Sequence, residues 1–586
     1  MSDQNQPFSQ RLARLVRQIY PDLDADILTS LIIDAFWPDG RIRRKRARPV
    51  GNTLWSEKDA LVITYGNSII DGKHKPLDLL RDFLQRYMAD AVNSVHILPF
   101  FPYTSDDGFA VSDYRAVNPQ LGDWPDITRI ADEFRLMSDL VLNHVSSQGH
   151  WFNAYLQGQA PYDRFFFEAS PEDDLTAVVR PRTTPLLQQV ETANGPRHVW
   201  CTFSHDQVDL DFRNPEVLLE FLRIIRLHVD NGVSIIRLDA VAFLWKIAGS
   251  PSIHLPQTHA IVQLMRTLCD YATEKIILLT ETNVPKAENL SYFGTGPHVG
   301  SEAHAIYNFP LPPLILHAMM SGNVEYLRRW QRAMPPAPMG CAYLNFTASH
   351  DGIGMRPVEG LLPDDEKTRV IDTVRKSGGL VSMRTLPDGD EAPYELNITF
   401  FEAMRQTFKG ADALHMARFI CSQTIVMSLE GIPAFYIHSL LATPNDHDSV
   451  VHRGMNRAIN RHRWDYPTLR ARLADPASDQ ATALSALSER LILRKAQPAF
   501  HPNATQFTVT IGDDRVFGLW RQSLHRHQSI FALHNVSDET VHLPLSVINL
   551  IEDQTWRDLL SDDIIDTAAD TLTLAPYQCR WISNKS

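Results

Sequence analysis

Short apolar runs, many ending in polar or charged residues, recur along the chain from about residue 60 to about residue 440. Stretches with helical spacing of apolar positions, such as Glu216–Val229 and Thr258–Ala272, separate many of them. Eight runs are candidate strands: Leu61–Tyr65, Ser94–Phe100, Met137–His144, Val233–Asp239, Ile276–Glu281, Ala303–Phe309, Cys341–Asp351 and Gly431–Ile437. Buried strands that alternate with helices form a parallel sheet, and eight such units close a barrel. The pattern predicts an α/β fold, a (β/α)8 TIM barrel.

The regions outside this alternation have a different pattern. Apolar residues near helical spacing open the chain, residues 146–205 and 354–410 are rich in Pro, Gly and polar residues, and short strands with turns follow residue 500. We therefore divide the chain into an N-terminal helical extension (1–58), barrel strands one to three (59–145), an inserted subdomain B (146–205), barrel strands four to seven (206–353), a second inserted subdomain (354–410), strand eight with closing helices (411–498) and a C-terminal β domain (499–586), which we expect to be a β-sandwich.

The composition and charge of the chain argue against several classes of protein. The net charge is −13, from 69 acidic and 56 basic residues, which argues against nucleic acid as a partner. We interpret the basic run Arg41–Arg48 as a solvated loop. Five scattered cysteines without a CxxC pair suit reduced thiols. With no secretory signal and no apolar segment of about 20 residues, we expect a cytoplasmic protein that does not engage a membrane.

Carboxylates follow three of the predicted strands, at the barrel end where active sites lie in this fold. Asp239 follows Arg237 by two residues, so both side chains point to one face and the guanidinium favours an ionised carboxylate. Glu281 ends the next strand after an apolar run, where burial would raise its pKa and keep it protonated. If the two carboxyl groups lie about 5–5.5 Å apart, they form the pair of a retaining glycosidase. Asp351, preceded by His350, would be a third carboxylate that binds sugar hydroxyls.

Each of these residues taken alone has a simpler interpretation. A strand-end aspartate is more often a cap or an ion-pair partner, and His144 or His350 alone is more often structural than catalytic. Their joint placement at successive strand ends, in the right order, favours the catalytic interpretation.

Four motifs in order resemble the signatures of the α-amylase superfamily of glycoside hydrolases, over about residues 60 to 500. They are DLVLNH (Asp139–His144), IIRLDAV (Ile235–Val241), the strand-end Glu281 and ASHDG (Ala348–Gly352). Further strings are similar to the sucrose phosphorylase subgroup: HILPFFPYTSDDGF (His96–Phe109), RPR (Arg180–Arg182), QVDLD (Gln207–Asp211), PYELN (Pro393–Asn397) and NRH (Asn460–His462). The resemblance implies a hexosyl-transferring phosphorylase with Asp239 as nucleophile, Glu281 as general acid/base and Asp351 as the third catalytic carboxylate.

The resemblance also assigns the substrate contacts. Asp106 and Arg461 would grip the terminal hydroxyl of the glucosyl ring, and the other ring contacts would be Phe109, His144, Gln207, Arg237, Phe243 and His350. Arg182 and Tyr394 lie on loops that contact phosphate and acceptor in the subgroup, and a salt-bridged surface arginine is the simpler interpretation of Arg182. No cofactor is implied, and inorganic phosphate is a co-substrate. Asn143 matches one calcium-ligand position, but without a cluster of oxygen ligands beside it we expect no metal.

The acceptor residues depart from those of sucrose phosphorylases. A histidine is replaced by Asn283, an acidic residue by Ala392, a glutamine by Glu395 and a tyrosine by Val179. Fructose is therefore disfavoured, and the first 58 residues with ETN, PYELN and RPRTTP look more like the branch that acts on glucosides of glycerol or glycerate. Because Glu395 would repel the glycerate carboxylate, we predict that 2-O-α-glucosylglycerol and phosphate give α-glucose 1-phosphate and glycerol, with anomeric retention.

Other functions stay open. In order of preference they are a glucosylglycerate phosphorylase, a sucrose or sucrose 6-phosphate phosphorylase, and an α-glucosidase in which water replaces phosphate. A remote alternative is an inactive barrel that serves as a binding or scaffold subunit. The expected partners are an α-glucoside, phosphate and a glycerol-like acceptor. The sequence leaves the oligomeric state open, with a homodimer as the alternative to test.

Overall fold

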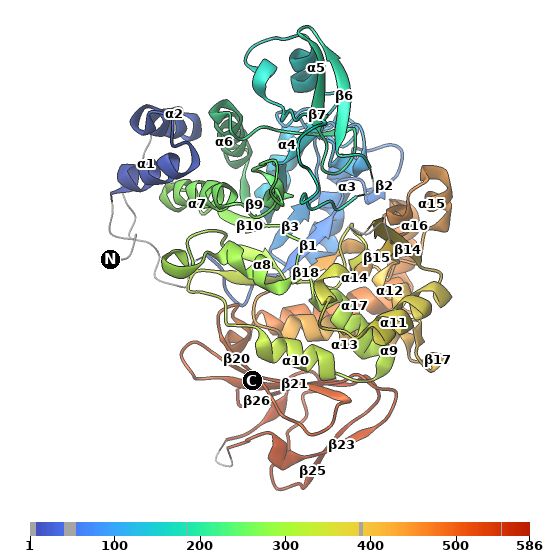
Figure 1. Cartoon of the computed structure of the whole chain (residues 1–586). Coiled ribbons are helices and arrows are strands. Elements are labelled where there is room, and N and C mark those ends of the chain that lie inside the picture. Colours follow the sequence, from blue (N-terminus) through green and yellow to red (C-terminus); the bar gives the residue numbers. More distant parts are fainter. Residues whose placement is uncertain (1–6, 40–53, 183, 386–390, 552–553, 586) are drawn as a thin grey trace.

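A closed barrel of eight parallel strands forms the centre of the molecule (Figure 1). The computed structural model describes residues 7–39, 54–182, 184–385, 391–551 and 554–585. The barrel strands are β1 (Leu61–Thr64), β3 (Ser94–Ile97), β4 (Arg135–Val141), β9 (Val233–Asp239), β10 (Ile277–Thr280), β11 (Ala305–Tyr307), β12 (Ala342–Asn345) and β18 (Ile432–Tyr436). They neighbour one another in chain order, and β18 closes on β1. All eight predicted runs are these strands, so the predicted TIM barrel is confirmed.

The register of the strands sets which strand-end residues meet. Asp139 on β4 lies opposite Arg237 on β9, and Val141 lies opposite Asp239. On the other side of β9, Arg237 lies opposite Leu279 of β10, which places Glu281 just beyond the end of β10. The carboxyl ends of β4, β9 and β10 therefore bring these polar side chains to one end of the barrel.

Helices surround the barrel, and their sequences explain where they start. α6 (Pro215–Asp230) follows the N-cap Asn214, whose side chain accepts from the backbone N–H of Glu216, and Pro215 fits the first helical turn. The other helices between or after barrel strands include α3 (Pro76–Phe83), α4 (Trp124–Ala131), α7 (Pro256–Tyr271), α9 (Leu311–Ser321), α10 (Glu325–Ala333), α13 (His415–Ser428), α16 (Tyr466–Ala474) and α17 (Asp479–Arg494).

The N-terminal residues form two helices, α1 (Phe8–Ile19) and α2 (Ala25–Phe36), which lie against α7 and α6 (Figure 1). Leu12, Leu15 and Ile19 are buried on α1, whereas Leu23 lies in the turn before α2 and is 44% exposed. Asp24 caps α2 by accepting from two backbone N–H groups. The basic run Arg41–Arg48 lies outside the described residues.

Two inserted regions flank the carboxyl end of the barrel. The first carries α5 (His150–Leu156) and the hairpin of β6 (Leu187–Thr192) with β7 (Gly195–Trp200). Just after it, β8 (Gln207–Asp209) pairs with β5 (His144–Ser146). The second carries α11 (Asp364–Lys376) and a sheet of β13 (Ile353–Gly354), β14 (Leu380–Thr385) and β15 (Glu391–Asn397). Farther along, α15 (His447–Arg453) and the 3-10 helix η9 (Asn456–Asn460) contact each other, and η9 approaches β14 and β15.

The C-terminal residues form antiparallel sheets, which lie at the end of the molecule away from α5 and β6 (Figure 1). A five-stranded sheet contains β20 (Thr505–Thr508), β21 (Val516–Gln522), β22 (Ser529–Asn535), β26 (Cys579–Ser583) and β24 (Arg557–Asp558), and a second sheet pairs β23 (Val541–Pro544) with β25 (Thr571–Leu574). All five cysteines lie within the described residues, are buried and form no disulfide. Within the same described ranges, every helix is too short or too polar to cross a bilayer.

Candidate active site

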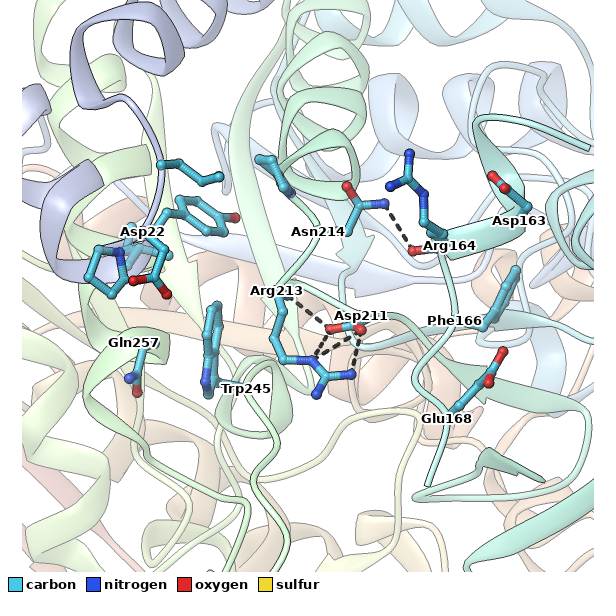
Figure 2. Close-up of a pocket in the computed structure, with 15 residues that line it drawn as sticks. Asp22, Asp163, Arg164, Phe166, Glu168, Asp211, Arg213, Asn214, Trp245 and Gln257 are labelled. Carbon is cyan, nitrogen blue, oxygen red and sulfur yellow. Dashed lines mark hydrogen bonds and ion pairs between the residues drawn. The ribbon is translucent and has the colours of Figure 1, made fainter. Parts of the chain in front are cut away.

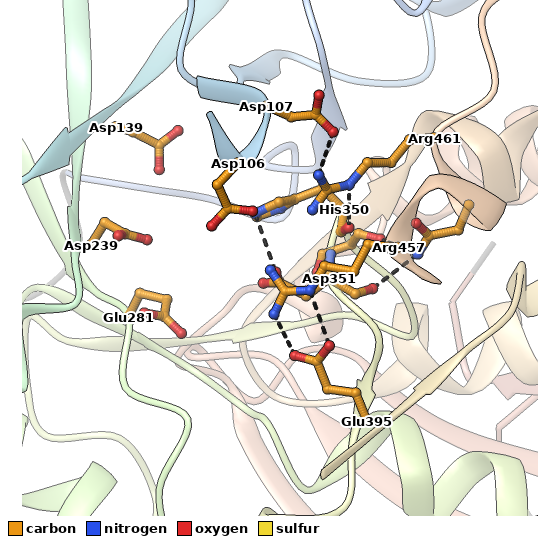
Figure 3. Close-up of polar contacts among 12 residues, drawn as sticks. Asp106, Asp107, Asp139, Asp239, Glu281, His350, Asp351, Glu395, Arg457 and Arg461 are labelled. Atoms are coloured by element: carbon orange, nitrogen blue, oxygen red, sulfur yellow. Dashed lines mark hydrogen bonds and ion pairs between the residues drawn. The ribbon is translucent and has the colours of Figure 1, made fainter. Parts of the chain in front are cut away.

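One pocket at the carboxyl end of the barrel gathers every predicted site residue except Phe243 and Arg461. Figure 3 shows polar contacts in and around this pocket. Its lining comprises Asp106, Phe109, His144, Arg182, Phe203, Gln207, Arg237, Asp239, Ala240, Glu281, Asn283, His350, Asp351, Tyr394, Glu395 and Arg457. The barrel strands and both inserted regions contribute to this lining, so residues distant in sequence face one another across a single cavity.

Asp239 is held by a buried arginine at the end of β9. Arg237 Nη1 lies 2.5 Å from Asp239 Oδ1 and 2.5 Å from Asp139 Oδ1. His96 Nε2 lies 2.7 Å from the other Asp139 oxygen. Asp139 therefore fixes the guanidinium, and the guanidinium fixes the direction of the Asp239 carboxylate.

Asp239 and Glu281 line the same pocket, and Glu281 Oε2 accepts from the backbone N–H of Ala240 at 3.4 Å. Burial raises the pKa of both carboxyl groups, although Arg237 opposes the rise, and the nearby charge of Glu281 adds to the rise for Asp239. Such a pair holds one proton between two sites. Because Arg237 contacts Asp239 directly, we assign the negative charge to Asp239 and the proton to Glu281.

Asp351 and Glu395 share one arginine that the sequence analysis missed. Arg457 Nη1 lies 2.7 Å from Asp351 Oδ1, and the same guanidinium contacts both oxygens of Glu395, at 3.0 Å from Nε and 2.5 Å from Nη2. Burial opposes ionisation of Asp351, but the guanidinium charge of Arg457, together with those of Arg461 and Arg237, outweighs it and holds the pKa of Asp351 well below the usual range. Asp351 is therefore charged, and Glu395, only 1% exposed, has its charge balanced.

Neutral rings and an amide line the part of the pocket nearest Asp106. The Phe109 ring stacks on the His350 ring with the centroids 4.7 Å apart. Together the two rings provide an apolar face from Phe109 and polar ring nitrogens from His350. Burial lowers the pKa of His350 to about 3 and also lowers the pKa of His144, so both histidines are uncharged. Gln207 Nε2 donates to Phe109 O at 3.3 Å and lies 3.4 Å from Asp106 Oδ2. These groups suit hydrogen bonding to sugar hydroxyls.

Arg461 and Phe243 lie outside the lining. Arg461 Nη1 lies 2.5 Å from Asp107 Oδ2 instead of contacting Asp106, and its Nε donates to the His350 carbonyl at 2.9 Å. In Figure 3 Asp107 is directed at Arg461. Phe203, from the first inserted region, lines the pocket, and the ring of Phe243 packs against it edge to face with the centroids 5.5 Å apart.

A positive group and a neutral polar group, Arg182 and Asn283, also line the pocket. Arg182 lies over the Tyr394 ring, 5.8 Å from its centroid, and forms no ion pair with any carboxylate of the described chain. Asn283 Oδ1 is buried and has no hydrogen-bond partner in the same ranges. Arg182 can therefore receive an anion, and Asn283 Oδ1 can accept from a hydroxyl group.

A larger hollow of about 750 Å³ lies between the α1–α2 turn and residues 163–168 and 211–215 (Figure 2). Among its carboxylates, Asp211 is paired with Arg213 at 2.7 Å, and Arg213 lies over the ring of Phe167, 4.2 Å from the centroid. The hollow lacks the convergent buried carboxylates found around Asp239, so we do not assign the reaction to it.

Comparison with known proteins agrees with this geometry. The α-amylase catalytic-domain family matches residues 82–354. The chain is 42% identical over 533 residues to the glucosylglycerate phosphorylase of Spirochaeta thermophila, with 90% of each chain covered. It is 28% identical over 426 residues to the glucosylglycerol phosphorylase of Marinobacter adhaerens, covering 71% of this chain and 83% of that one. The crystal structure of sucrose 6F-phosphate phosphorylase from Thermoanaerobacter thermosaccharolyticum matches with a TM-score of 0.70 and 24% identity, over 82% of this chain and 94% of that one.

The chain belongs to the α-amylase family. Within that family it falls in the sucrose phosphorylase subgroup and is a retaining glycoside phosphorylase, which makes it a hexosyltransferase. The motifs from Asp139 to Gly352 predicted this membership, and it is confirmed.

In this member of the α-amylase family a lysine lies beside Asn143. Lys246 Nζ lies 2.9 Å from Asn143 Oδ1, 2.9 Å from Phe243 O and 3.0 Å from Asp209 Oδ2. Lys246 and Asp209 are both buried, so the ammonium balances a buried carboxylate and uses the oxygen of Asn143 that could otherwise bind a cation. The described residues contain no cluster of His, Cys, Asp and Glu suited to a metal ion.

Proposed function

We propose that this phosphorylase acts on an α-glucosylglycerate, which with phosphate gives α-glucose 1-phosphate and glycerate. The observation that carries the proposal is the ion pair between Glu395 and Arg457, because it removes the reason for preferring glycerol. A free Glu395 carboxylate would repel the carboxylate of glycerate. Because Arg457 binds both oxygens of Glu395, the positive charge of the guanidinium offsets the negative charge of Glu395, and this repulsion is weakened.

The relatives support the same acceptor. The chain is 42% identical to a glucosylglycerate phosphorylase but 28% identical to a glucosylglycerol phosphorylase, and the former similarity covers more of the chain. The glycerol prediction is therefore less well supported than the glycerate alternative. Arg182, which is not neutralised by a described carboxylate, provides the cation that the glycerate carboxylate or the phosphate needs.

The reaction follows two displacements. In the first, Asp239 attacks the anomeric carbon while Glu281 gives its proton to the departing glycerate oxygen, which leaves a glucosyl ester on Asp239 and an ionised Glu281. In the second, a phosphate oxygen attacks the same carbon from the face that glycerate left, and Glu281 regains a proton from the phosphate. The two inversions give net retention at the anomeric carbon.

The remaining residues hold the ring and the acceptor. Asp106, His144, Gln207 and His350 contact the glucosyl hydroxyls and Phe109 lies along the ring. The negative charge of Asp351 stabilises the positive charge that develops on the ring in the transition state. Arg457 lines the pocket and holds Asp351, so we propose that its guanidinium contributes to binding the glucosyl ring, the role that we predicted for Arg461. Arg182, Asn283 and Tyr394 contact glycerate and phosphate in turn, at the acceptor end of the pocket.

An acceptor screen in the synthetic direction tests the proposal. Purified enzyme is incubated with α-glucose 1-phosphate and, separately, D-glycerate, L-glycerate, glycerol, fructose and fructose 6-phosphate, and phosphate release is measured. We expect kcat/KM for one enantiomer of glycerate to exceed that for glycerol by at least about tenfold, the effect of one additional charge-assisted contact. A higher kcat/KM for glycerol would reject glycerate, and release of free glucose from a glucoside without phosphate would indicate an α-glucosidase.

A further inference from the structure

A second, small cavity shares a wall with the active-site pocket. Asp106 lines the active-site pocket, whereas the next residue, Asp107, lines the second cavity. Both residues have left-handed backbone angles, with φ of 51° and 50°, which turns their side chains to different sides. The cavity measures about 50 Å³, and we call it the arginine pocket because its lining includes Tyr65, Tyr103, Asp107, Arg453, Arg461 and Arg463.

Positive charge exceeds negative charge in the arginine pocket. Its described lining contains three arginines but one carboxylate, Asp107. Asp107 contacts both Arg453 and Arg461, the latter at 2.5 Å, while exposed Arg463 forms no ion pair with a described residue. Burial opposes ionisation of Asp107, but Arg461 and Arg453 together lower its pKa to about 2. The carboxylate is therefore charged near neutral pH, and two arginine charges still have no balancing group in the lining.

Two buried hydrogen-bond donors on the lining residues have no acceptor among the described residues. Arg461 is 4% exposed and uses Nε for the His350 carbonyl and Nη1 for Asp107. Its Nη2 atom is buried and has no hydrogen-bond partner in the described part of the chain, and the same holds for the Tyr65 hydroxyl. A buried donor without an acceptor is costly, and donors on a guanidinium are satisfied best by an oxyanion.

We propose that the arginine pocket binds a small tetrahedral oxyanion of the phosphate class, at a site separate from the reacting centre. A space of about 50 Å³ corresponds to roughly three or four waters, which matches the five heavy atoms of phosphate or sulfate and excludes a sugar phosphate. Arg463 lies at the exposed side and attracts the anion, and Arg453 and Arg461 hold it from within. The bound anion accepts from Arg461 Nη2 without displacing the contacts of Nε and Nη1.

Sulfate distinguishes this site from the catalytic phosphate site. Sodium sulfate is titrated by calorimetry, at constant ionic strength, into the wild-type enzyme and into Arg463→Gln, Arg453→Gln, Arg182→Ala and Arg472→Gln. Arg463 is outside the catalytic machinery and exposed, so its replacement preserves the fold, and Arg472 is an exposed arginine outside both pockets and serves as the matched control.

We expect saturable sulfate binding by the wild type, Arg182→Ala and Arg472→Gln, and at least about tenfold weaker binding by Arg463→Gln and Arg453→Gln, since each loses a charge-assisted hydrogen bond. Equal affinities of Arg463→Gln and Arg472→Gln would overturn the proposal, as would loss of all binding in Arg182→Ala or no saturable binding by the wild type. The outcome does not depend on catalysis, so failure of the glycerate assignment leaves this test unaffected.

Thermal unfolding gives a second measurement on the same proteins. A ligand that binds only the folded state raises the melting temperature, by an amount that follows its concentration relative to the dissociation constant. We expect sulfate to raise the melting temperature of Arg472→Gln and to raise that of Arg463→Gln less at every concentration. The same shift in both variants would count against the arginine pocket.

Discussion

Arg457 and Glu395 form a two-pronged ion pair inside the active-site pocket, with Nε 3.0 Å from one carboxylate oxygen and Nη2 2.5 Å from the other. The remaining guanidinium nitrogen, Nη1, holds Asp351 at 2.7 Å. One buried arginine therefore sets the charge of a residue on the acceptor side and of a residue beside the glucosyl ring. Its loss should affect stability and catalysis together.

Replacing Arg457 by methionine is expected to lower the free energy of unfolding by about 3–5 kcal/mol, because Glu395 and Asp351 would be left buried without a partner. We expect kcat/KM for the glucoside to fall at least about 100-fold as Asp351 loses its position. Urea unfolding of the wild type, Arg457→Met, Glu395→Gln and the double variant forms a double-mutant cycle. We expect the loss of unfolding free energy in the double variant to be smaller than the sum of the two single losses, by about 1–3 kcal/mol. Simple additivity would show that the pair does not act as a unit.

Replacing Asp239 by asparagine should abolish glucosyl transfer while the protein stays folded. Exchange of labelled phosphate into α-glucose 1-phosphate needs the glucosyl-enzyme but no acceptor, so it measures the nucleophile independently of the acceptor's identity. We expect the exchange rate to drop by about 10⁴-fold or more, as for other covalent nucleophiles. Asp448→Asn, at an exposed position on α15, is the matched control and should exchange at the wild-type rate. Exchange that persists in Asp239→Asn would assign the nucleophile elsewhere.

The strand-end residues were predictable because the barrel itself places them. Asp239 and Glu281 follow apolar runs whose parallel register is fixed by burial, so sequence position alone brings both to one end of neighbouring strands. The alternation of strands and helices likewise predicted the barrel, because the strands of a parallel barrel are buried on both faces and therefore appear in the sequence as apolar runs.

The residues contributed by loops were less predictable. Whether Asp106 or Asp107 meets Arg461 depends on two consecutive left-handed residues, which no periodicity marks. Arg457 lies four residues before Arg461 in a short 3-10 segment, and only the folded loop decides which of the two faces Asp351. Phe203 comes from an inserted region whose path the apolar pattern does not determine.

The pH dependence of kcat/KM should be bell-shaped, because one carboxyl group must be ionised and the other protonated. The alkaline limb reports the loss of the Glu281 proton and should lie above the ordinary glutamate pKa of about 4.3, since burial raises the pKa of Glu281. Glu281→Gln should lose this limb when assayed with α-glucosyl fluoride, whose leaving group needs no acid, in a kcat/KM profile from about pH 4 to about pH 9. An unchanged alkaline limb in that variant would assign it to another group.

The raised pKa of Glu281 also makes the free energy of unfolding depend on pH in a definite direction. The folded protein binds the Glu281 proton more tightly than the unfolded chain does, so this group's contribution to stability is present at low pH and declines as pH rises from about 4.3 through the raised value. Urea unfolding of wild type and Glu281→Gln across that interval should show a smaller decline in the variant. A parallel dependence would show that Glu281 does not carry the proton.

Replacing Lys246 by methionine should destabilise the protein by about 3–5 kcal/mol, because Asp209 would remain buried with its main counter-charge removed. Lys367→Gln is the matched control: it removes the partner of an exposed carboxylate, Asp364, and should change the free energy of unfolding little. Because the Lys246 ammonium engages Asn143 and Asp209, we also expect a chelator to leave the phosphorolysis rate of the wild type unchanged. If calcium restored the stability of Lys246→Met, the ammonium would be acting in the place of a cation; if instead the chelator abolished wild-type activity, a metal would be required and our interpretation of Asn143 would be wrong.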